Sequence, residues 1–436
     1  MIAVLIAVVT LTLVGLRLTL AIDRTARGLR LTALAILYGS GAVMFALMLL
    51  SSLHIRWSAM SALLTLFAFA GIASIVPSHE THRATPSVDR PAAHVLDAAT
   101  AVTVISFAAY ANITGPTEWD FWTDWGLKAR VFLYHGAIDW SWLQNPWHEL
   151  AHPDYPLLVP LNYVFPALMQ GGWSERWLGV LFVCWTIAIL LIVRALTREE
   201  TSNWISAAAA LAAAPIATSL YVGLAEGTFI AYAGASLLFL RRAILREDPL
   251  DWRHGALLLG LAANCKNEGL ALIAAVAIGI ICSQPHRWRR VVRLWPAIAL
   301  AAPWLMLRAT HALPTDIARG SILARFVDRV SSPGDVLIAL NELLADRWSW
   351  MAILAALLIV PRAIARERFI VLVTVVQVVV YTIVYFATPN EATVHIATSW
   401  DRLTRQMQLP ITVVCVMSLG GMLASLAAPS KSAAMS

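Results

Sequence analysis

Apolar runs of about 17–25 residues recur along nearly the whole of this sequence, and they constrain its fold more than any other feature. A helix of that length crosses the hydrocarbon core of a bilayer, which is about 30 Å thick. Only helices and closed β-barrels satisfy all of their own backbone hydrogen bonds in lipid. Runs such as 187–193 and 369–380 lack the alternation of a barrel strand. We therefore predict an all-α integral membrane protein.

The composition excludes a soluble enzyme. Of the 436 residues, 59% are hydrophobic and 13% are charged, whereas soluble domains carry about 25% charged residues. The formal net charge is +6, and 29 of the 32 basic residues are arginines. These arginines lie in short clusters between the apolar runs, which is typical of the positive-inside rule rather than of a nucleic-acid patch. We expect no nucleic-acid partner.

About thirteen transmembrane helices are expected from the apolar runs. Residues 1–16 carry no charge and lack the basic start of a cleaved signal peptide, so the first run is counted as a span. The run at 255–282 is expected to form two short helices. The expected spans are 2–22, 31–52, 58–76, 95–113, 175–194, 204–222, 227–243, 255–282, 294–309, 348–360, 369–387 and 406–427.

The arginine clusters assign the loops to two sides of the membrane. Eighteen of the 29 arginines lie on one side, which the positive-inside rule makes cytoplasmic together with a tail at 428–436. The other side receives the loops at 114–174, 310–347 and 388–405, the short link around Glu226 and the break at Lys266–Glu268, and together these hold nearly all of the chemically suggestive residues. The loop at 114–174 contains seven tryptophans, which predicts amphipathic helices in the headgroup layer.

The first candidate cluster starts the long loop. On one helix, Asp120, Asp124 and Lys128 would be spaced i, i+4 and i+8 and share a face. A partly desolvated carboxylate at a membrane surface can act as a general base. Two structural alternatives stay open: Asp120 could cap a helix in the pattern Thr117-x-x-Asp120, and Asp124 could simply pair with Lys128.

Two further clusters interrupt apolar sequence. His152, Asp154 and Tyr155 lie between prolines that fix the backbone, which favours a substrate-orienting turn over a plain connection. Lys266 with Asn267 and Glu268 breaks an apolar run. A charged residue within a membrane segment is costly and therefore indicates function, and the alternative is a Lys266–Glu268 pair at the water boundary.

The last cluster lies at the final outer loop and includes His395, Arg402 and Arg405. Basic residues on this face oppose the positive-inside pattern, and arginine offers a bidentate fork for phosphate. An Asp401–Arg405 pair on an amphipathic helix is the structural alternative. Glu226, in a short turn, and Arg308, at the end of a span, are weaker indications. Motifs typical of ATPases and common hydrolases are absent from the sequence.

These motifs resemble the GT-C superfamily of membrane glycosyltransferases, and family 39 with its bacterial relatives most closely. The resemblance rests on four segments and covers about residues 95–427, so residues 1–94 are additional N-terminal helices. A second acid often follows the first one in that family, whereas Phe121 follows Asp120 here. The four segments are Trp119-Asp120-Phe-Trp with Leu-Lys128-Ala-Arg, His152-Pro-Asp-Tyr-Pro-Leu-Leu, Lys266-Asn-Glu-Gly, and Thr398-Ser399 with Asp401-Arg402-Leu.

The resemblance implies an inverting transfer of a sugar from a polyprenyl-phosphate donor to an extracytoplasmic acceptor in a bacterial inner membrane. The acceptor would be a glycan, lipid or protein. Asp120 would be the base. The phosphate-binding residues would be Lys128, Lys266, Arg402, Arg405 and Arg308. The substrate-orienting residues would be Asp124, His152, Asp154, Tyr155, Glu226, Asn267, Glu268 and His395.

No cofactor is required by this interpretation, although Asp120 and Asp124 together could hold a divalent metal. A transporter or flippase for a lipid-linked anionic glycan is the alternative function, since it would use a similar cationic cavity without a base. A transporter of this kind often has two related halves, and the sequence shows no internal repeat. A structural membrane subunit would leave the polar residues dispersed.

Overall fold

The computed structural model describes residues 2–75, 91–219, 222–283, 287–315, 320–343, 347–360 and 363–426. The expected tail at 428–436 lies outside these residues. Every regular element among the described residues is helical, and helices make up 83% of the structure. The all-α prediction is confirmed.

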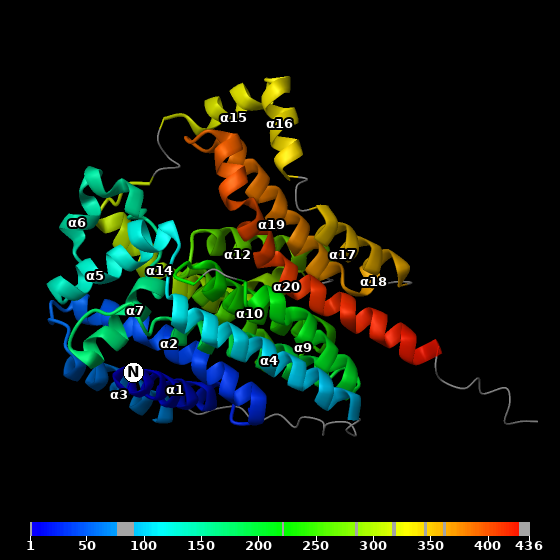
Figure 1. The fold of residues 1–436 in the computed structure, drawn as a ribbon, viewed down its shortest axis with the longest axis horizontal. Coiled ribbons are helices and arrows are strands. Elements are labelled where there is room, and N and C mark those ends of the chain that lie inside the picture. Colours follow the sequence, from blue (N-terminus) through cyan, green and yellow to red (C-terminus); the bar gives the residue numbers. More distant parts are fainter. Residues whose placement is uncertain are drawn as a thin grey trace, which may run out of the picture.

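Twenty α-helices are described (Figure 1). They are α1 (Ile2–Ile22), α2 (Gly28–Ser52), α3 (Ala59–Ile75), α4 (Pro91–Thr114), α5 (Gly126–His135), α6 (Trp140–Gln144), α7 (Leu158–Gln170), α8 (Gly179–Arg198), α9 (Asn203–Ala217), α10 (Glu226–Arg246), α11 (Pro249–Ala263), α12 (Glu268–Ser283), α13 (Arg287–Val292), α14 (Trp295–Thr310), α15 (Ile322–Val330), α16 (Pro333–Leu343), α17 (Arg347–Ile359), α18 (Ala363–Arg366), α19 (Arg368–Ala387) and α20 (Ala392–Leu426). A π-helical turn, η1 (Phe121–Trp125), and a 3₁₀ turn, η2 (Pro146–Ala151), complete the long loop.

Seven of the described helices have the length and apolar composition of a membrane span, namely α1, α2, α4, α8, α10, α19 and α20. Shorter apolar helices, of 10–17 residues, occupy other expected spans. The run expected at 255–282 is indeed divided, into α11 and α12. The structure therefore supports a multi-pass membrane protein, while the count of thirteen spans stays a prediction.

The long helices form a layered bundle around α10 (Figure 1). In the most apolar part of α10, 94% of the residues are buried, compared with 11% in α4. This contrast places α10 at the centre and α4 at the lipid-facing edge. Close packing depends on small residues: a Cβ added at Gly15 of α1 would lie 1.8 Å from the Ala35 carbonyl oxygen of α2. Glycine at such a crossing lets two helix backbones approach.

Short helices are gathered at one end of the bundle, where α5, α6 and α15–α16 lie beyond the ends of the long helices (Figure 1). The prediction of interfacial helices in the loop at 114–174 is wrong for α7. Residues 158–167 of α7 are all buried, because this stretch is apolar on every face apart from Asn162. The Asn162 amide bonds to Ser40 inside the bundle, so α7 is part of the bundle and does not lie in the headgroup layer.

Candidate functional site

A polar cavity with a volume of about 360 Å³ lies where η1, the start of α10, the α11–α12 break, α19 and α20 meet. Ten of the fourteen side chains predicted from the sequence line it. They are Asp120, Asp124, His152, Tyr155, Glu226, Lys266, Asn267, Glu268, His395 and Arg402. Segments separated by up to 282 residues in the chain therefore contribute to one site.

A chain of ion pairs crosses this cavity. The Lys266 ammonium lies 2.9 Å from the Glu268 carboxylate and 3.0 Å from that of Glu226. Glu226 is also 3.7 Å from the Arg402 guanidinium, which lies 2.9 Å from Asp120. Two cations and three carboxylates alternate along this line. Glu226 is the central member, with contacts to both cations, although its place in the sequence was only a weak indication.

The break between α11 and α12 brings Lys266 into the cavity. The amide of Asn264, the residue after α11, donates to the carbonyls of Gly260 in α11 and Leu300 in α14, which ties the turn to both helices. Gly269 then starts α12 in close contact with α11, since a Cβ there would lie 2.5 Å from the Ala262 carbonyl oxygen. The tight turn leaves Lys266 only 6% exposed, so its charge is compensated by carboxylates rather than by water.

The segment after α4 does not form the regular α-helix expected from the spacing of Asp120, Asp124 and Lys128. It forms the π-helical turn η1, a geometry found often at functional sites. The Asp120 side chain makes no capping hydrogen bond, so the structure does not contain the capping alternative. The Asp120 carboxylate pairs with Arg402 across the cavity instead.

The expected ion-pair alternative does describe Asp124 and Lys128, whose charged groups lie 2.7 Å apart. Burial raises the pKa of the Asp124 carboxyl to about 6, and the neighbouring Lys128 charge opposes part of that rise. The Lys128 ammonium also donates to the His152 carbonyl and is fully buried. Lys128 therefore holds the η1 turn against the His152 turn and does not line the cavity.

Three other predicted residues lie behind or outside the cavity. Asp154 is buried, accepts a hydrogen bond of 3.0 Å from the Asn267 amide, and lies 3.5 Å from Arg308. This link fixes the orientation of Asn267, which lines the cavity. Arg405 lies 3.8 Å from Asp401 on the same helix, in agreement with the structural alternative for that pair.

Two tyrosines of α19 line the cavity and were not predicted. The Tyr381 hydroxyl donates to the Gln406 side chain, and the Tyr385 hydroxyl bonds to Ser399. A signal was present in the sequence, because Gln377, Tyr381 and Tyr385 are polar positions spaced by four residues in an otherwise apolar helix. That spacing puts them on one face.

Several buried polar atoms of the cavity have no hydrogen-bond partner among the described residues. They include Glu226 Oε2, Glu268 Oε2 and Arg402 Nε. A buried polar group without a partner costs about 1–3 kcal/mol. Two acceptors and one donor in one cavity match a polar ligand that carries both hydroxyl groups and negative charge.

The donor set does not fit a divalent metal. The described residues contain no group of three or more His, Cys, Asp or Glu side chains close enough to hold an ion. Asp120 and Asp124, the two carboxylates expected for such a site, form ion pairs with Arg402 and Lys128.

No family model matches this sequence, and no curated protein or solved structure matches it either. Any conclusion about function therefore rests on the chemistry of the cavity. Convergence of these polar residues is the opposite of the dispersed pattern expected for a structural subunit.

Proposed function

We propose that the protein is a GT-C type glycosyltransferase that moves a sugar from a polyprenyl phosphate to an extracytoplasmic acceptor hydroxyl. The observation that carries this proposal is the convergence of Asp120, Glu226, Lys266 and Arg402 on one cavity within an apolar helical bundle. The expected setting is a bacterial inner membrane with the cavity on the outer face.

The two cations suit a leaving phosphate. Lys266 supplies a compact charge, and Arg402 supplies a planar fork that matches phosphate oxygens. Both are paired with carboxylates, so an incoming phosphate would compete with Asp120 for Arg402. Binding of the donor would thus release the Asp120 carboxylate next to the reacting sugar, which couples occupancy of the site to activation of its base.

Asp120 is the best placed of the cavity acids to be the base. Its side chain is 39% exposed, compared with 3% for Glu226 and 17% for Glu268. In the displacement, the acceptor oxygen bonds to the anomeric carbon and passes its proton to Asp120. The bond from that carbon to the phosphate oxygen breaks, and polyprenyl phosphate leaves with the electron pair. A positioned base contributes about 10²–10⁴ in rate.

The other walls of the cavity suit the rest of the donor. Ala271, Val380 and Val384 from α12 and α19 form an apolar side that can contact the first isoprene units. Tyr155 stacks on His152 with ring centroids 4.7 Å apart, and these two rings give the cavity an aromatic wall that can contact a sugar. Each part of a lipid-linked sugar phosphate therefore has a matching surface.

The test is release of polyprenyl phosphate from a panel of polyprenyl-phosphate sugars by the purified protein in lipid. Asp120→Asn is compared with Glu118→Gln, a carboxylate-to-amide change two residues away that does not touch the cavity. We expect Asp120→Asn to lose about 10²–10⁴ in turnover and Glu118→Gln to keep wild-type turnover.

Equal turnover by wild type and Asp120→Asn would remove Asp120 from the mechanism. Donor binding without release, in the presence of a broad panel of acceptors, would contradict the transferase and favour the transporter.

A further inference from the structure

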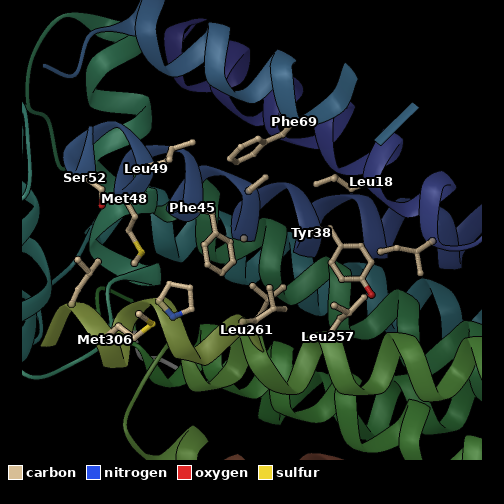
Figure 2. Close-up of a pocket in the computed structure, with 16 residues that line it drawn as sticks. Leu18, Tyr38, Phe45, Met48, Leu49, Ser52, Phe69, Leu257, Leu261 and Met306 are labelled. Atoms are coloured by element: carbon tan, nitrogen blue, oxygen red, sulfur yellow. The ribbon is translucent and has the colours of Figure 1, made fainter. Parts of the chain in front are cut away.

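An apolar groove separates α1–α3 from α11 and α14. Figure 2 shows side chains from these helices, among them Phe45 and Met48 of α2, Phe69 of α3 and Met306 of α14, pointing into a shared space. Its volume is about 740 Å³. The groove shares no lining residue with the polar cavity, so a ligand in the groove is independent of the proposed function.

The groove continues to a basic rim. Leu18, Ile22, Phe69 and Leu257 line both the groove and a neighbouring hollow of about 900 Å³ that reaches Arg253 and Arg293. Ala21 and Ala73 connect that hollow to a third one, lined by Arg17, Arg24 and Arg27. One continuous surface therefore runs from an arginine cluster into the apolar interior of the helix layer.

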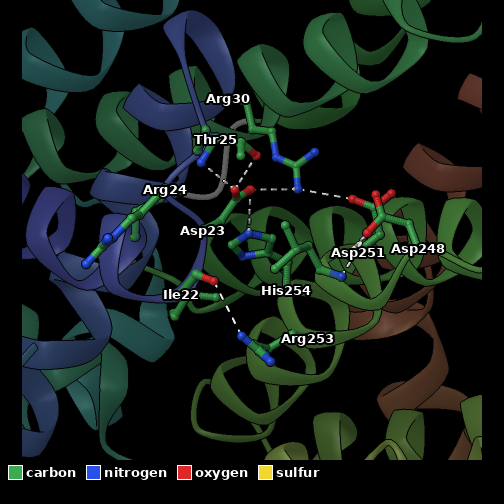
Figure 3. Close-up of polar contacts among 12 residues, drawn as sticks. Ile22, Asp23, Arg24, Thr25, Arg30, Asp248, Asp251, Arg253 and His254 are labelled. Atoms are coloured by element: carbon green, nitrogen blue, oxygen red, sulfur yellow. Dashed lines mark hydrogen bonds and ion pairs between the residues drawn. The ribbon is translucent and has the colours of Figure 1, made fainter. Parts of the chain in front are cut away.

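Two of the nearby acids face inward and do not neutralise this rim, whereas the exposed Glu247 lies 3.8 Å from Arg293. Figure 3 shows Asp23 and Asp251 turned toward Arg30, while the side chains of Arg24 and Arg253 point away from these contacts. Asp23 lies 3.4 Å from Arg30 and 3.3 Å from His254, and both acids are fully buried.

Among the described residues, three arginines of the rim carry a positive charge that no nearby carboxylate compensates. Within the described part of the chain, Arg17, Arg24 and Arg253 have no carboxylate within ion-pair distance. Trp295 stands at the same rim and is 66% exposed, as is typical of tryptophans at the level of lipid headgroups.

We propose that this surface binds one anionic glycerophospholipid, with its phosphate among Arg24, Arg253 and their neighbours and an acyl chain in the groove. Along α2, the lining of the groove extends from Tyr38 to Ser52, which is about 21 Å at the helical rise of 1.5 Å per residue. A single leaflet provides a hydrocarbon depth of about 15 Å, so the groove accommodates one chain of a lipid anchored at the rim. Basic pockets between membrane helices bind anionic headgroups in this way.

The lipid would fill the seam between the N-terminal helices and the rest of the bundle. It would therefore stabilise the docking of α1–α3 and link the lipid composition of the membrane to the stability of the protein. Ligands that bind only the folded state raise stability by mass action.

The experiment is native mass spectrometry of the full-length protein with phosphatidylglycerol or phosphatidylcholine that carry the same chains. We expect wild type to hold one phosphatidylglycerol at least about tenfold more tightly than phosphatidylcholine. The double variant Arg24→Gln/Arg253→Gln should lose this preference, and Arg289→Gln, an exposed arginine that lines none of these hollows, should keep it.

The groove itself is tested by Leu18→Trp, which adds bulk where the groove and the adjoining hollow meet. This variant should bind both lipids more weakly while the anionic preference of the remaining binding persists. Equal binding of the two lipids by wild type, or unchanged phosphatidylglycerol binding by the double variant, would overturn the proposal. Tighter binding of a polyprenyl phosphate, lost in the double variant, would overturn the assignment to a glycerophospholipid.

Discussion

Replacing Glu226 by Gln removes the negative charge that lies between two buried cations. At an effective dielectric constant of about 20, its attraction is about 5.5 kcal/mol to a charge at the 3.0 Å distance of Lys266 and about 4.5 kcal/mol at the 3.7 Å distance of Arg402. Desolvation of the carboxylate offsets several kcal/mol of this sum. Breaking a buried ion pair by removing one partner costs about 3–5 kcal/mol.

The lower end of that range applies here, because Lys266 keeps Glu268 and Arg402 keeps Asp120. We therefore expect Glu226→Gln to lower the free energy of unfolding by about 3 kcal/mol. Equilibrium unfolding in SDS mixed micelles, followed by tryptophan fluorescence, measures it. Glu118→Gln is the matched control and should change the free energy by less than about 0.5 kcal/mol.

A double-mutant cycle with Lys266→Met tests the reason behind this number. Once the cation is absent, Glu226→Gln should cost clearly less than in the wild-type background, because less uncompensated charge remains. A cost of Glu226→Gln below about 1 kcal/mol, or a cost that Lys266→Met leaves unchanged, would refute the reasoning.

Three other changes have outcomes that the geometry predicts. The pKa of Asp124 is raised from 3.8 to about 6 in the folded protein, so the folded form binds a proton more readily than the unfolded form. The stability of the wild type relative to Asp124→Asn should therefore rise as pH falls from 7 to 4, as measured by thermal unfolding, and a fall of this relative stability toward acid pH would contradict the prediction. Gly39→Ala should destabilise the protein by about 1–3 kcal/mol, because the new Cβ would lie 1.9 Å from the Leu11 carbonyl oxygen. Gly71→Ala, with open space around it, should be neutral or stabilising in the same unfolding assay. Equal changes in stability for the two variants would rule out the close approach of α1 and α2. Arg402→Gln should lower release of polyprenyl phosphate by about 10²–10³ while the exposed Arg176→Gln leaves it unchanged, and equal activity of both variants would exclude Arg402 from the leaving-group site.

Much of the fold could be predicted from the sequence, because long apolar runs in a bilayer leave few alternatives to helices. The divided run at 255–282 was predicted from Lys266 and Glu268, whose charges an uninterrupted span would not tolerate. The burial of α7 was not predicted, since its apolar stretch is only thirteen residues long and follows a polar segment. Length and position favoured the membrane surface, and tertiary packing decided otherwise.

The cavity could be predicted only in part. Residues that interrupt an apolar or rigid segment were identified from the cost of placing charge there, and ten of the predicted residues meet at one site. The pairing of Asp120 with Arg402 could not be predicted, because it depends on the relative positions of η1 and α20. The family resemblance implies that Lys128 binds phosphate, but its buried ammonium pairs with Asp124 and donates to the His152 carbonyl, outside the lining of the cavity.

The central claim is that Arg402 and Lys266 hold the phosphate of a lipid-linked sugar next to Asp120. The most direct measurement is an experimental structure with a non-hydrolysable polyprenyl phosphonate sugar. We expect the phosphonate within about 4 Å of both cations, with Asp120 released from Arg402 and facing the anomeric carbon. A phosphonate bound away from this cavity, with the Asp120–Arg402 pair intact, would contradict the claim.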